Sequence, residues 1–454
     1  MENTEKVKVG MISLGCAKTL VDSEVALGFL KESNYEIVPT VQDADVAIVN
    51  TCAFIGAARE ESVEKVVELI GLKEEGVIKK VVVMGCLPQK YYQDLKDELS
   101  EVDAFVGTGD YPEIAKILKE VQEGKKVVAV GSPQFLYDME SPRFSLTPSY
   151  YRYVKISEGC NHKCSFCIIP QLKGLHRSRE IPDVIKEVEQ HGKEGVQEVI
   201  LTGQDTTFYG KDFANKFVLP DLLRDLNKVE AIKWIRLLYA YPVHLSDHIL
   251  KAIADSEKVC NYIDVPLQHI SDNMLNTMNR HVDSKFTKKL VNRIRTIIPE
   301  VAIRTTFIVG FPGETDDDFN QLMEFIAEAQ FERLGVFQYS FEEFSESSKL
   351  PNQLPEEVKE ERFNKLMSLQ RDISKKMNEQ WIDKTCEVLI EGESTVKNTY
   401  IGRTYRDAPD VDGQFFVTAP EGVKLKTGQF VQSKIKSSKE YDLYGDMITS
   451  GMNS

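Results

Sequence analysis

The chain alternates short apolar runs with helix-length amphipathic segments over two long stretches, and this alternation restricts the possible folds most strongly. In residues 7–130, runs such as VKVGMISLG, DVAIVN and KKVVVMG predict strands that are separated by helices. In residues 151–340, six strand candidates are separated by helical patterns. Strands that alternate with helices form parallel sheets with helical crossovers. We therefore predict two α/β units, the second of which is an open or closed barrel of six β/α units.

The predicted strands of the second unit are YRYVKIS, EVILT, WIRLLYA, YIDVPL, RTTFIVG and RLGVFQYS. A long helix, PEEVKEERFNKLMSLQRDISKKMNEQW, is predicted to follow them. After it, the β-like runs CEVLIEG, GQFFVTAP and GQFVQSKIK are separated by Gly and Asp turns, which predicts a small all-β barrel. Residues 131–150 are rich in Pro and Ser, and their apolar residues follow neither the helical nor the strand period, which predicts a linker. The predicted domains are therefore 7–130, 151–380 and 381–450.

The composition is typical of a globular protein in a reducing compartment. Of 454 residues, 42% are hydrophobic and 28% are charged, and no apolar run approaches the ~18–20 residues of a membrane span. The start, MENTEKVKVG, is polar and leads into a strand pattern, so we expect no signal peptide and a cytoplasmic location. The eight cysteines are then expected to be thiols or metal ligands. The net charge of −15 argues against broad attraction to nucleic acid and is compatible with a basic protein partner.

Three cysteines lie within eight positions of SEGCNHKCSFCIIP, at Cys160, Cys164 and Cys167. They occupy the loop after the first predicted strand of the barrel, and barrel chemistry belongs to loops at the carboxyl ends of strands. Three thiolates can bind three irons of a cubane cluster and leave the fourth iron open for a non-protein ligand. The alternative is a zinc site with His162 or a distant residue as the fourth ligand.

Three other cysteines are far apart in sequence, but each directly follows a predicted strand of the first unit. They are Cys16 in SLGCAKTLVDSE, Cys52 in VNTCAFIGAARE and Cys86 in VMGCLPQK. Because ligands bind at the carboxyl ends of strands in open α/β sheets, these cysteines are expected to converge on one point. The alternative is that they are small core residues, which is also our interpretation of Cys260 and Cys386.

The cysteine spacing, the aromatic residue before the third cysteine and the barrel that follows resemble the radical S-adenosylmethionine (SAM) superfamily. The resemblance implies that SAM chelates the open iron. An electron from the reduced cluster then cleaves SAM to methionine and a 5′-deoxyadenosyl radical. The resemblance also places SAM contacts in the cysteine loop, in TGQD and in TTFIVGFPGET, although the last segment alternatively reads as a buried strand with a Pro-Gly turn. The contacts implied are Phe166, Gly203, Gln204, Ile308, Gly310 and Gly313.

All six cysteines, in this order, resemble the methylthiotransferase family over essentially the whole chain. That family has an N-terminal cysteine domain, a radical SAM barrel and a C-terminal, OB-like TRAM barrel. The segments SLGCAKTLVDSE, NTCAFI, GCLPQKY, KISEGCNHKCSFCIIP, DVPLQHISDNML and YDLYG look like its RimO branch. Ala17 and Thr19 depart from the Pro and Asn that are usual in this branch, but they replace no ligand.

The resemblance implies methylthiolation of the β-carbon of an aspartate in small-subunit ribosomal protein twelve. Two 4Fe–4S clusters are implied, and SAM serves as both methyl donor and radical source. The implied partners are the ribosomal protein, free or in the ribosome, an electron donor and a sulfur source. No general acid or base is predicted. The implied cluster ligands are Cys160, Cys164 and Cys167 for the SAM-cleaving cluster and Cys16, Cys52 and Cys86 for the auxiliary cluster.

Two other function classes are compatible with these motifs: a tRNA adenosine methylthiotransferase of the sister branch, and a non-catalytic iron–sulfur protein that binds RNA. Residues 384–436 of the terminal barrel contain eight Lys/Arg and seven Asp/Glu, a balance of +1. An RNA-binding module is expected to be clearly basic, so this balance favours a protein substrate. His176, Arg177 and Arg179, which follow the cysteine loop, are interpreted either as lining the site or as exposed charges.

Overall fold

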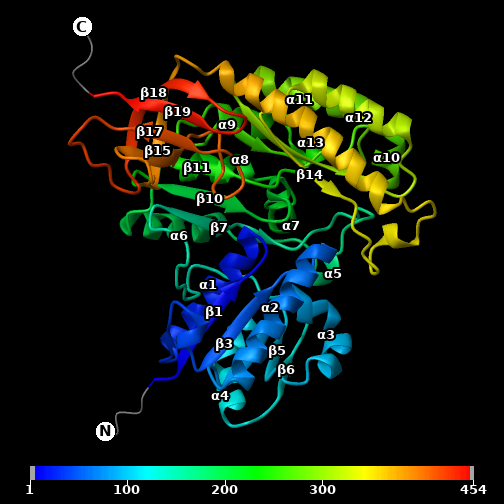
Figure 1. Cartoon of the computed structure of the whole chain (residues 1–454), viewed down its shortest axis with the longest axis vertical. Helices are drawn as coiled ribbons and strands as arrows, with labels where there is room; N and C mark the ends of the chain where they lie inside the picture. The colour runs from blue at the N-terminus through cyan, green and yellow to red at the C-terminus, as the bar shows by residue number, and fades with distance from the viewer. Residues whose placement is uncertain (1–5, 450–454) are drawn as a thin grey trace.

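The computed structural model describes residues 6–449, and the chain forms an N-terminal, a central and a C-terminal unit (Figure 1). The N-terminal unit is a parallel sheet of six strands in the order β2-β1-β3-β4-β5-β6. Its strands are β1 (Lys8–Ser13), β2 (Glu36–Ile37), β3 (Val46–Thr51), β4 (Lys80–Gly85), β5 (Ala104–Val106) and β6 (Val127–Ala129). Its helices are α1 (Ala17–Glu32), α2 (Gly56–Glu74), α3 (Cys86–Glu98) and α4 (Ile114–Gln122).

Helices cover both faces of this sheet because alternate strand residues point to opposite sides. In β3, Ile48 packs with α1 and α4, whereas Val49 packs with α2 and α3. The sheet is buried on both faces, which explains why its strands read as continuous apolar runs.

The run AAREESVEKVVELIGLKEEG predicts a helix with Val63, Val66, Val67 and Ile70 on one face, but this face is not uniformly buried in α2, because Val67 is 53% exposed. The buried face is instead centred on Val66 and Leu69, and Val67 lies too far around the helix to reach it.

The central unit confirms the six predicted β/α units. Its strands form two parallel three-stranded sheets, β7-β10-β11 and β12-β13-β14, joined by a bridge between Ile235 and Val259. Among the described residues, β7 and β14 do not pair, so the barrel is open. The main strands are β7 (Tyr151–Lys155), β10 (Glu198–Thr202), β11 (Trp234–Leu237), β12 (Tyr262–Asp264), β13 (Ala302–Val309) and β14 (Arg333–Gln338).

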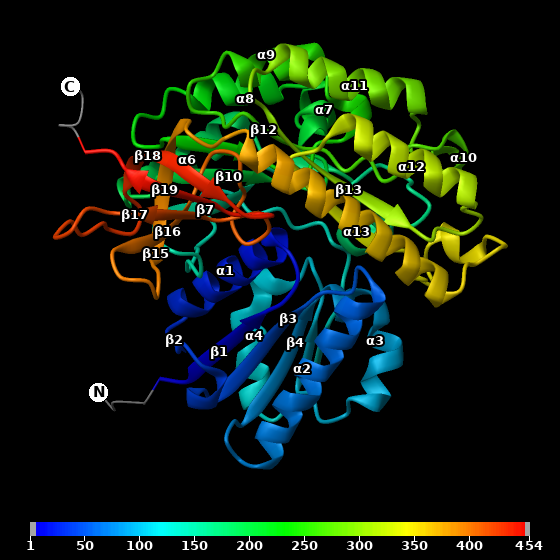
Figure 2. The same cartoon turned by 45° about the horizontal axis from the view of Figure 1, so that its top comes forward.

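Helices cover the outside of the open barrel. Helix α13 packs along β14, and Figure 2 shows α13 running from the C-terminal unit beside α12. The longer helices are α6 (Ile181–Lys193), α8 (Leu219–Leu226), α9 (Asp247–Ala254), α11 (Ser284–Ile297), α12 (Asp316–Ala329) and α13 (Glu356–Glu379). The shorter elements are β8 (Ser157–Glu158), α5 (Ile169–Lys173), β9 (Arg177–Ser178), α7 (Lys211–Ala214) and α10 (Asp272–Thr277).

The C-terminal unit is a closed five-stranded barrel in the order β15-β16-β17-β19-β18. The three predicted β-runs became β15, β17 and β18, but two strands were not predicted. Both missed strands are short and follow turn-rich polar segments, so their period-2 pattern is weak. The strands are β15 (Thr385–Glu393), β16 (Thr399–Arg403), β17 (Phe415–Thr418), β18 (Phe430–Ser438) and β19 (Leu443–Met447).

This barrel docks at the amino ends of the central strands. Glu198 starts β10 and pairs with both Arg236 and Arg403, and Arg333 starts β14 and pairs with Asp407. The carboxyl ends of the central strands, where barrel chemistry is expected, therefore lie at the opposite end of the unit.

Residues 131–150 contain no helix or strand, as predicted for a linker, but they pack firmly against both neighbouring units. Tyr137 is 1% exposed, and Arg143 pairs with Glu24 of α1 and Glu187 of α6. The exact domain boundaries stay predictions. Within residues 6–449, no helix is both long and apolar enough to cross a membrane.

Candidate active site

The loop between β8 and α5 carries the clustered cysteines and holds their sulfurs among hydrogen-bond donors. The backbone N–H of His162 donates to Cys160 Sγ and that of Ile169 donates to Cys167 Sγ, each at 3.4 Å. Arg280 donates to Cys164 Sγ at 3.3 Å. Donors aimed at sulfur favour the thiolate form, which is the form that binds metals. All three cysteines are free thiols.

Burial alone disfavours those thiolates. It raises the pKa of Cys160 to about 12 and raises the pKa of Cys167 further. Buried thiols of this kind release their protons when a metal ion binds, because the ion supplies the positive charge that the protein lacks. The loop is therefore suited to a thiolate-bound metal centre.

The other three cysteines follow three adjacent parallel strands. Cys16 caps α1 after β1, Cys52 follows β3, and Cys86 begins α3 directly after β4. The register pairs Thr51 with Gly85, so Cys52 and Cys86 leave the sheet side by side. The structure therefore brings these three predicted residues to one edge of the sheet.

Gly15 allows Cys16 and Cys52 to approach each other. Its φ is +94°, and a Cβ at this position would lie 2.9 Å from the Cβ of Cys52.

The electrostatic surroundings of the Cys16 and Cys86 thiols differ. Burial would raise the pKa of Cys16, but Lys18 and Thr19 reverse the shift, so its pKa is lowered. Burial raises the pKa of Cys86 to about 12.

A buried ionic cluster, here called the Asp22 cluster, connects the N-terminal and central units beside both cysteine sets. Asp22 of α1 accepts hydrogen bonds from Lys155 of β7 and from Lys173 of α5, the latter at 2.6 Å. Lys155 also pairs with Glu158. Burial would raise the pKa of Glu158, but Lys155 and Lys173 hold it well below its usual range.

Sequence reasoning missed the Asp22 cluster, although one signal was present. Lys155 lies within the apolar run YRYVKIS, and a charged residue inside a buried strand requires a partner. Nothing in the sequence identifies that partner, because Asp22 lies 133 residues earlier.

The predicted SAM contacts lie in two groups near the cysteine loop. Gly203 and Gln204 follow β10, where Gln204 Nε2 donates to Glu158 and its buried Oε1 has no hydrogen-bond partner among residues 6–449. Phe166 packs against the apolar cluster that contains Ile308 of β13, although 142 positions separate them. A buried oxygen without a described partner is suited to a donor group of a ligand, and an apolar wall is suited to a ring.

The two glycines after β13 differ in their surroundings. Gly310 has a φ of +73°, and a Cβ there would lie 2.3 Å from Lys359 Cγ of α13, so packing alone requires this glycine. Gly313 has a φ of +81° in a turn with open space around it.

Residues that follow the cysteine loop are mostly structural. Arg179 is 3% exposed and pairs with Asp183 and Glu187 of α6, so the interpretation of Arg179 as an exposed charge is wrong. His176 is buried and its Nε2 lies 2.9 Å from Ser178 Oγ. Arg177 binds the carbonyl groups of Leu175 and Lys173.

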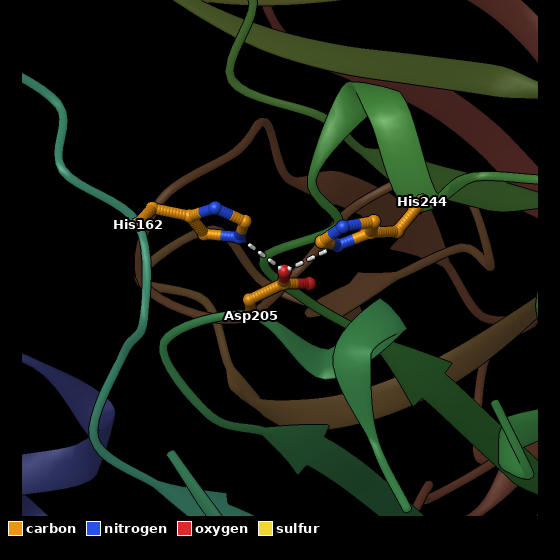
Figure 3. A group of neighbouring side chains, drawn as sticks. All are labelled: His162, Asp205 and His244. Atoms are coloured by element: carbon orange, nitrogen blue, oxygen red, sulfur yellow. Dashed lines mark hydrogen bonds and ion pairs between the residues drawn. The ribbon is translucent and has the colours of Figure 1, made fainter. Parts of the chain in front are cut away.

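The other cysteines and His162 also have clear positions. Cys260 and Cys386 are buried, at 4% and 8% exposure. The imidazole Nε2 of His162 points at Asp205 (Figure 3). This nitrogen is therefore already engaged outside the cysteine loop.

Three segments of the chain match known protein families. Residues 8–107 match a family described as uncharacterized protein family UPF0004, residues 154–326 match the radical SAM superfamily, and residues 382–448 match the TRAM domain. The ribosomal protein uS12 methylthiotransferase RimO of Syntrophotalea carbinolica is 48% identical over 449 residues, covering 98% of each chain. The protein of the same name from Clostridioides difficile is 44% identical over 442 residues, covering 97% of this chain and 99% of the relative.

This chain belongs to the RimO family. It is therefore a radical SAM methylthiotransferase, and its cofactors are SAM and two 4Fe–4S clusters, as the sequence resemblance predicted. The family assignment also confirms the predicted order of cysteine domain, radical SAM barrel and TRAM barrel. The zinc and non-catalytic alternatives are not favoured for a RimO-family enzyme.

Solved structures share the fold at low sequence identity. The radical SAM methyltransferase TsrM from Kitasatospora setae superposes with a TM-score of 0.55 at 14% identity, covering 90% of this chain and 82% of that chain. The radical enzyme OxsB gives a TM-score of 0.53 at 12% identity, covering 82% of this chain and 56% of that chain. These similarities support the RimO-family fold and carry no further functional argument.

Proposed function

We propose that this enzyme replaces a hydrogen on the β-carbon of an aspartate in small-subunit ribosomal protein uS12 with a methylthio group. The observation that carries the proposal is the full-length similarity to relatives whose names state uS12 methylthiolation. The near-neutral C-terminal barrel, with a balance of +1, supports a protein substrate over tRNA. The tRNA adenosine alternative is therefore not favoured.

We assign the SAM-cleaving cluster to the loop cysteines Cys160, Cys164 and Cys167. Three free thiols on one loop, each near a donor or a partner cysteine, support this assignment. We assign the auxiliary cluster to Cys16, Cys52 and Cys86. Their positions at adjacent strand ends support it. When bound, the clusters and SAM supply the electron, the 5′-deoxyadenosyl radical and the methylthio group.

The chain's own residues orient SAM and balance charge. Gln204 Oε1 is positioned to accept a hydrogen bond from the SAM amino group, since it is buried and no described residue donates to it. Phe166 and Ile308 offer an apolar wall for adenine. The remaining proposed contacts, Gly203, Gly310 and Gly313, shape the backbone around these side chains.

Two lysines act on cysteines that would become negatively charged thiolates in the auxiliary cluster. Lys18 opposes the effect of burial on Cys16, and Lys173 does the same for Cys86. Lys18 Nζ also lies 3.4 Å from the centroid of the Tyr239 ring, which fixes its direction. These cations are placed to stabilise thiolates at the auxiliary site.

The remaining partners are an electron donor and a sulfur source, and the proposed location is the cytoplasm. The substrate is uS12, either free or within the ribosome. The eight cysteines, all of which are free thiols, support the location.

The substrate can be tested in a deletion strain that carries plasmid copies of the enzyme. Mass spectrometry of uS12 should show one methylthio group on an aspartate with the wild-type copy. It should show none with the Cys160/Cys164/Cys167→Ala triple variant. Cys260→Ala, which changes a buried cysteine outside both sets, is the control and should retain the modification.

Purified proteins separate the roles of the two cysteine sets. After anaerobic reconstitution, either triple alanine variant should contain about half of the wild-type iron, because each set holds three irons of one cluster. Only the loop variant should lose cleavage of SAM to 5′-deoxyadenosine.

The deletion strain also tests the alternative substrate. Loss of a methylthio group from tRNA adenosine in that strain, with uS12 unchanged, would overturn the proposed substrate.

A further inference from the structure

Two histidines from separate loops point at one carboxylate oxygen beside the cysteine loop (Figure 3). His162 Nε2 lies 2.7 Å and His244 Nδ1 lies 2.9 Å from Asp205 Oδ2. The three ligand atoms all lie within 4.8 Å of one another. His162 belongs to the cysteine loop, Asp205 follows β10, and His244 lies in the turn after β11. We call these residues the His-Asp-His group.

The carboxylate of this group is fixed in one orientation. Asp205 Oδ1 accepts hydrogen bonds from the backbone N–H groups of Thr207 and Phe208, at 3.0 and 3.2 Å, and from Thr207 Oγ1 at 2.5 Å. Only Oδ2 therefore remains for the imidazoles. Outer hydrogen bonds of this kind support carboxylates that ligate metals.

The imidazole of His162 is also fixed. It stacks on Tyr241 with a centroid distance of 3.7 Å and an interplanar angle of 8°. Tyr241 in turn donates to the carbonyl of Arg280 at 3.1 Å. Contacts outside the group therefore help to hold His162 and Asp205 in place.

The charge of the group is incomplete. The side chain of Asp205 is 2% exposed, and its ion-pair partners are two imidazoles, which are neutral unless protonated. Its five hydrogen bonds compensate for burial but supply no formal positive charge while both imidazoles are neutral. Thiolates of the adjacent cysteine loop would increase the local negative charge, so a cation at this position is favoured.

We propose that His162, Asp205 and His244 bind a divalent transition-metal ion, for which Zn²⁺ is the best match, as a site separate from the iron–sulfur clusters. Two imidazole nitrogens and one carboxylate oxygen are typical zinc ligands. The histidine side chains are 16% and 15% exposed, so solvent can reach the site and provide a fourth ligand. The ion would tie the cysteine loop to the ends of β10 and β11.

The required rearrangement concerns all three separations between the ligand atoms, which now lie within 4.8 Å of one another. Zinc bonds of ~2.0–2.1 Å at tetrahedral angles separate ligand atoms by about 3.3 Å. The two nitrogen–oxygen distances would then widen by a few tenths of an ångström from 2.7 and 2.9 Å. In each neutral ring the proton moves to the other ring nitrogen, so that the nitrogen facing Asp205 can bind the ion and each imidazole stays neutral.

One substitution separates metal binding from simple hydrogen bonding. In His244→Asn, the Asn Nδ2 group takes the place of His Nδ1 and can still donate to Asp205, but an amide nitrogen is a poor zinc ligand. His248→Ala is the control, because His248 is exposed on α9 only four positions away. Asp205→Ala is a second variant that removes the shared ligand.

The experiment uses anaerobically reconstituted enzyme that is incubated with Zn²⁺ and desalted. Elemental analysis should find one additional zinc per chain in the wild type and in His248→Ala, and none in His244→Asn or Asp205→Ala. Zinc X-ray absorption should show nitrogen and oxygen ligands at ~2.0–2.1 Å and no sulfur at ~2.3 Å. Zinc should raise the melting temperature of the wild type but not that of His244→Asn.

Three results would overturn the proposal. They are a wild type without additional zinc, equal zinc binding by His244→Asn, and sulfur among the zinc ligands. In each case, the His-Asp-His group would be a hydrogen-bonded clamp on the cysteine loop. None of these results bears on uS12 modification, so this test is independent of the proposed function.

Discussion

The Asp22 cluster makes a measurable prediction about how the N-terminal and central units are held together. In Asp22→Asn, the carboxylate that accepts hydrogen bonds from Lys155 and Lys173 becomes a neutral amide with one acceptor oxygen. The side chains of Asp22, Lys155 and Lys173 are 5%, 1% and 6% exposed, so solvent screening does not weaken these pairs. Lys155 retains Glu158, but Lys173 is left 3.8 Å from that carboxylate.

The magnitude follows from this geometry. Breaking a buried ion pair by removing one partner costs ~3–5 kcal/mol. Because Asn retains one acceptor and Lys155 retains Glu158, we expect the lower end, about 3 kcal/mol. At ~2–4 °C per kcal/mol for a domain of this size, the melting temperature should fall by about 6–12 °C.

The assay is thermal unfolding of the reconstituted enzyme, together with proteolysis of residues 131–150, which join the two units. Glu32→Gln is the matched control, because Glu32 is exposed at the end of the same helix. Asp22→Asn should be cleaved faster than the control. Equal melting temperatures and equal cleavage of the two variants would refute the reasoning.

Three further predictions concern single residues. Gln204→Ala should weaken SAM binding about 10-fold or more, because a hydrogen bond to a charged group contributes ~1.5–3 kcal/mol; an unchanged Kd by calorimetry would contradict it. Gly15→Ala should lose about half of the bound iron, whereas Gly76→Ala, with a φ of +74° but open space, should keep all of it; equal iron contents would contradict this. Burial would raise the pKa of Asp103, but Lys73 and Lys80 hold it below its usual range. Asp103 therefore adds stability above its unfolded pKa of ~3.9, and this is lost as the pH falls through the lower folded pKa. The difference in melting temperature between the apo wild type and Asp103→Asn should have its full value at pH 7 and become smaller below about pH 4. A difference that stays constant with pH would contradict this prediction.

Local periodicity predicted most of the fold. The run EVILT became β10 over the same five residues, because a buried parallel strand reads as a continuous apolar run. The weak patterns of β16 and β19 were missed, since short barrel strands next to turns contain few alternating positions. Spacing alone places Val67 on one face of α2 with Val63, Val66 and Ile70, and only packing shows where the buried part of that face ends.

The site was predictable only in part. Cysteine spacing and strand order indicated both cysteine sets, because those signals are local or depend on sheet topology. The Asp22 cluster and the His-Asp-His group depend on side chains brought together from distant loops. No period or motif in the sequence connects His162 with His244, which lie 82 positions apart.

The buried carboxylates of α1 have a consequence for synthesis on the ribosome. Glu24 accepts a hydrogen bond from Arg143, and Asp22 accepts one from Lys173. Because both donors come later in the chain, α1 leaves the ribosome before they have been synthesised. At ~5–20 residues per second, the intervening ~150 residues take roughly 7 to 30 s. During that interval, Asp22 and Glu24 lack these partners on the helix that begins after Cys16. We therefore expect the edge that carries Cys16, Cys52 and Cys86 to be more accessible for cluster assembly during that interval than after the barrel has docked.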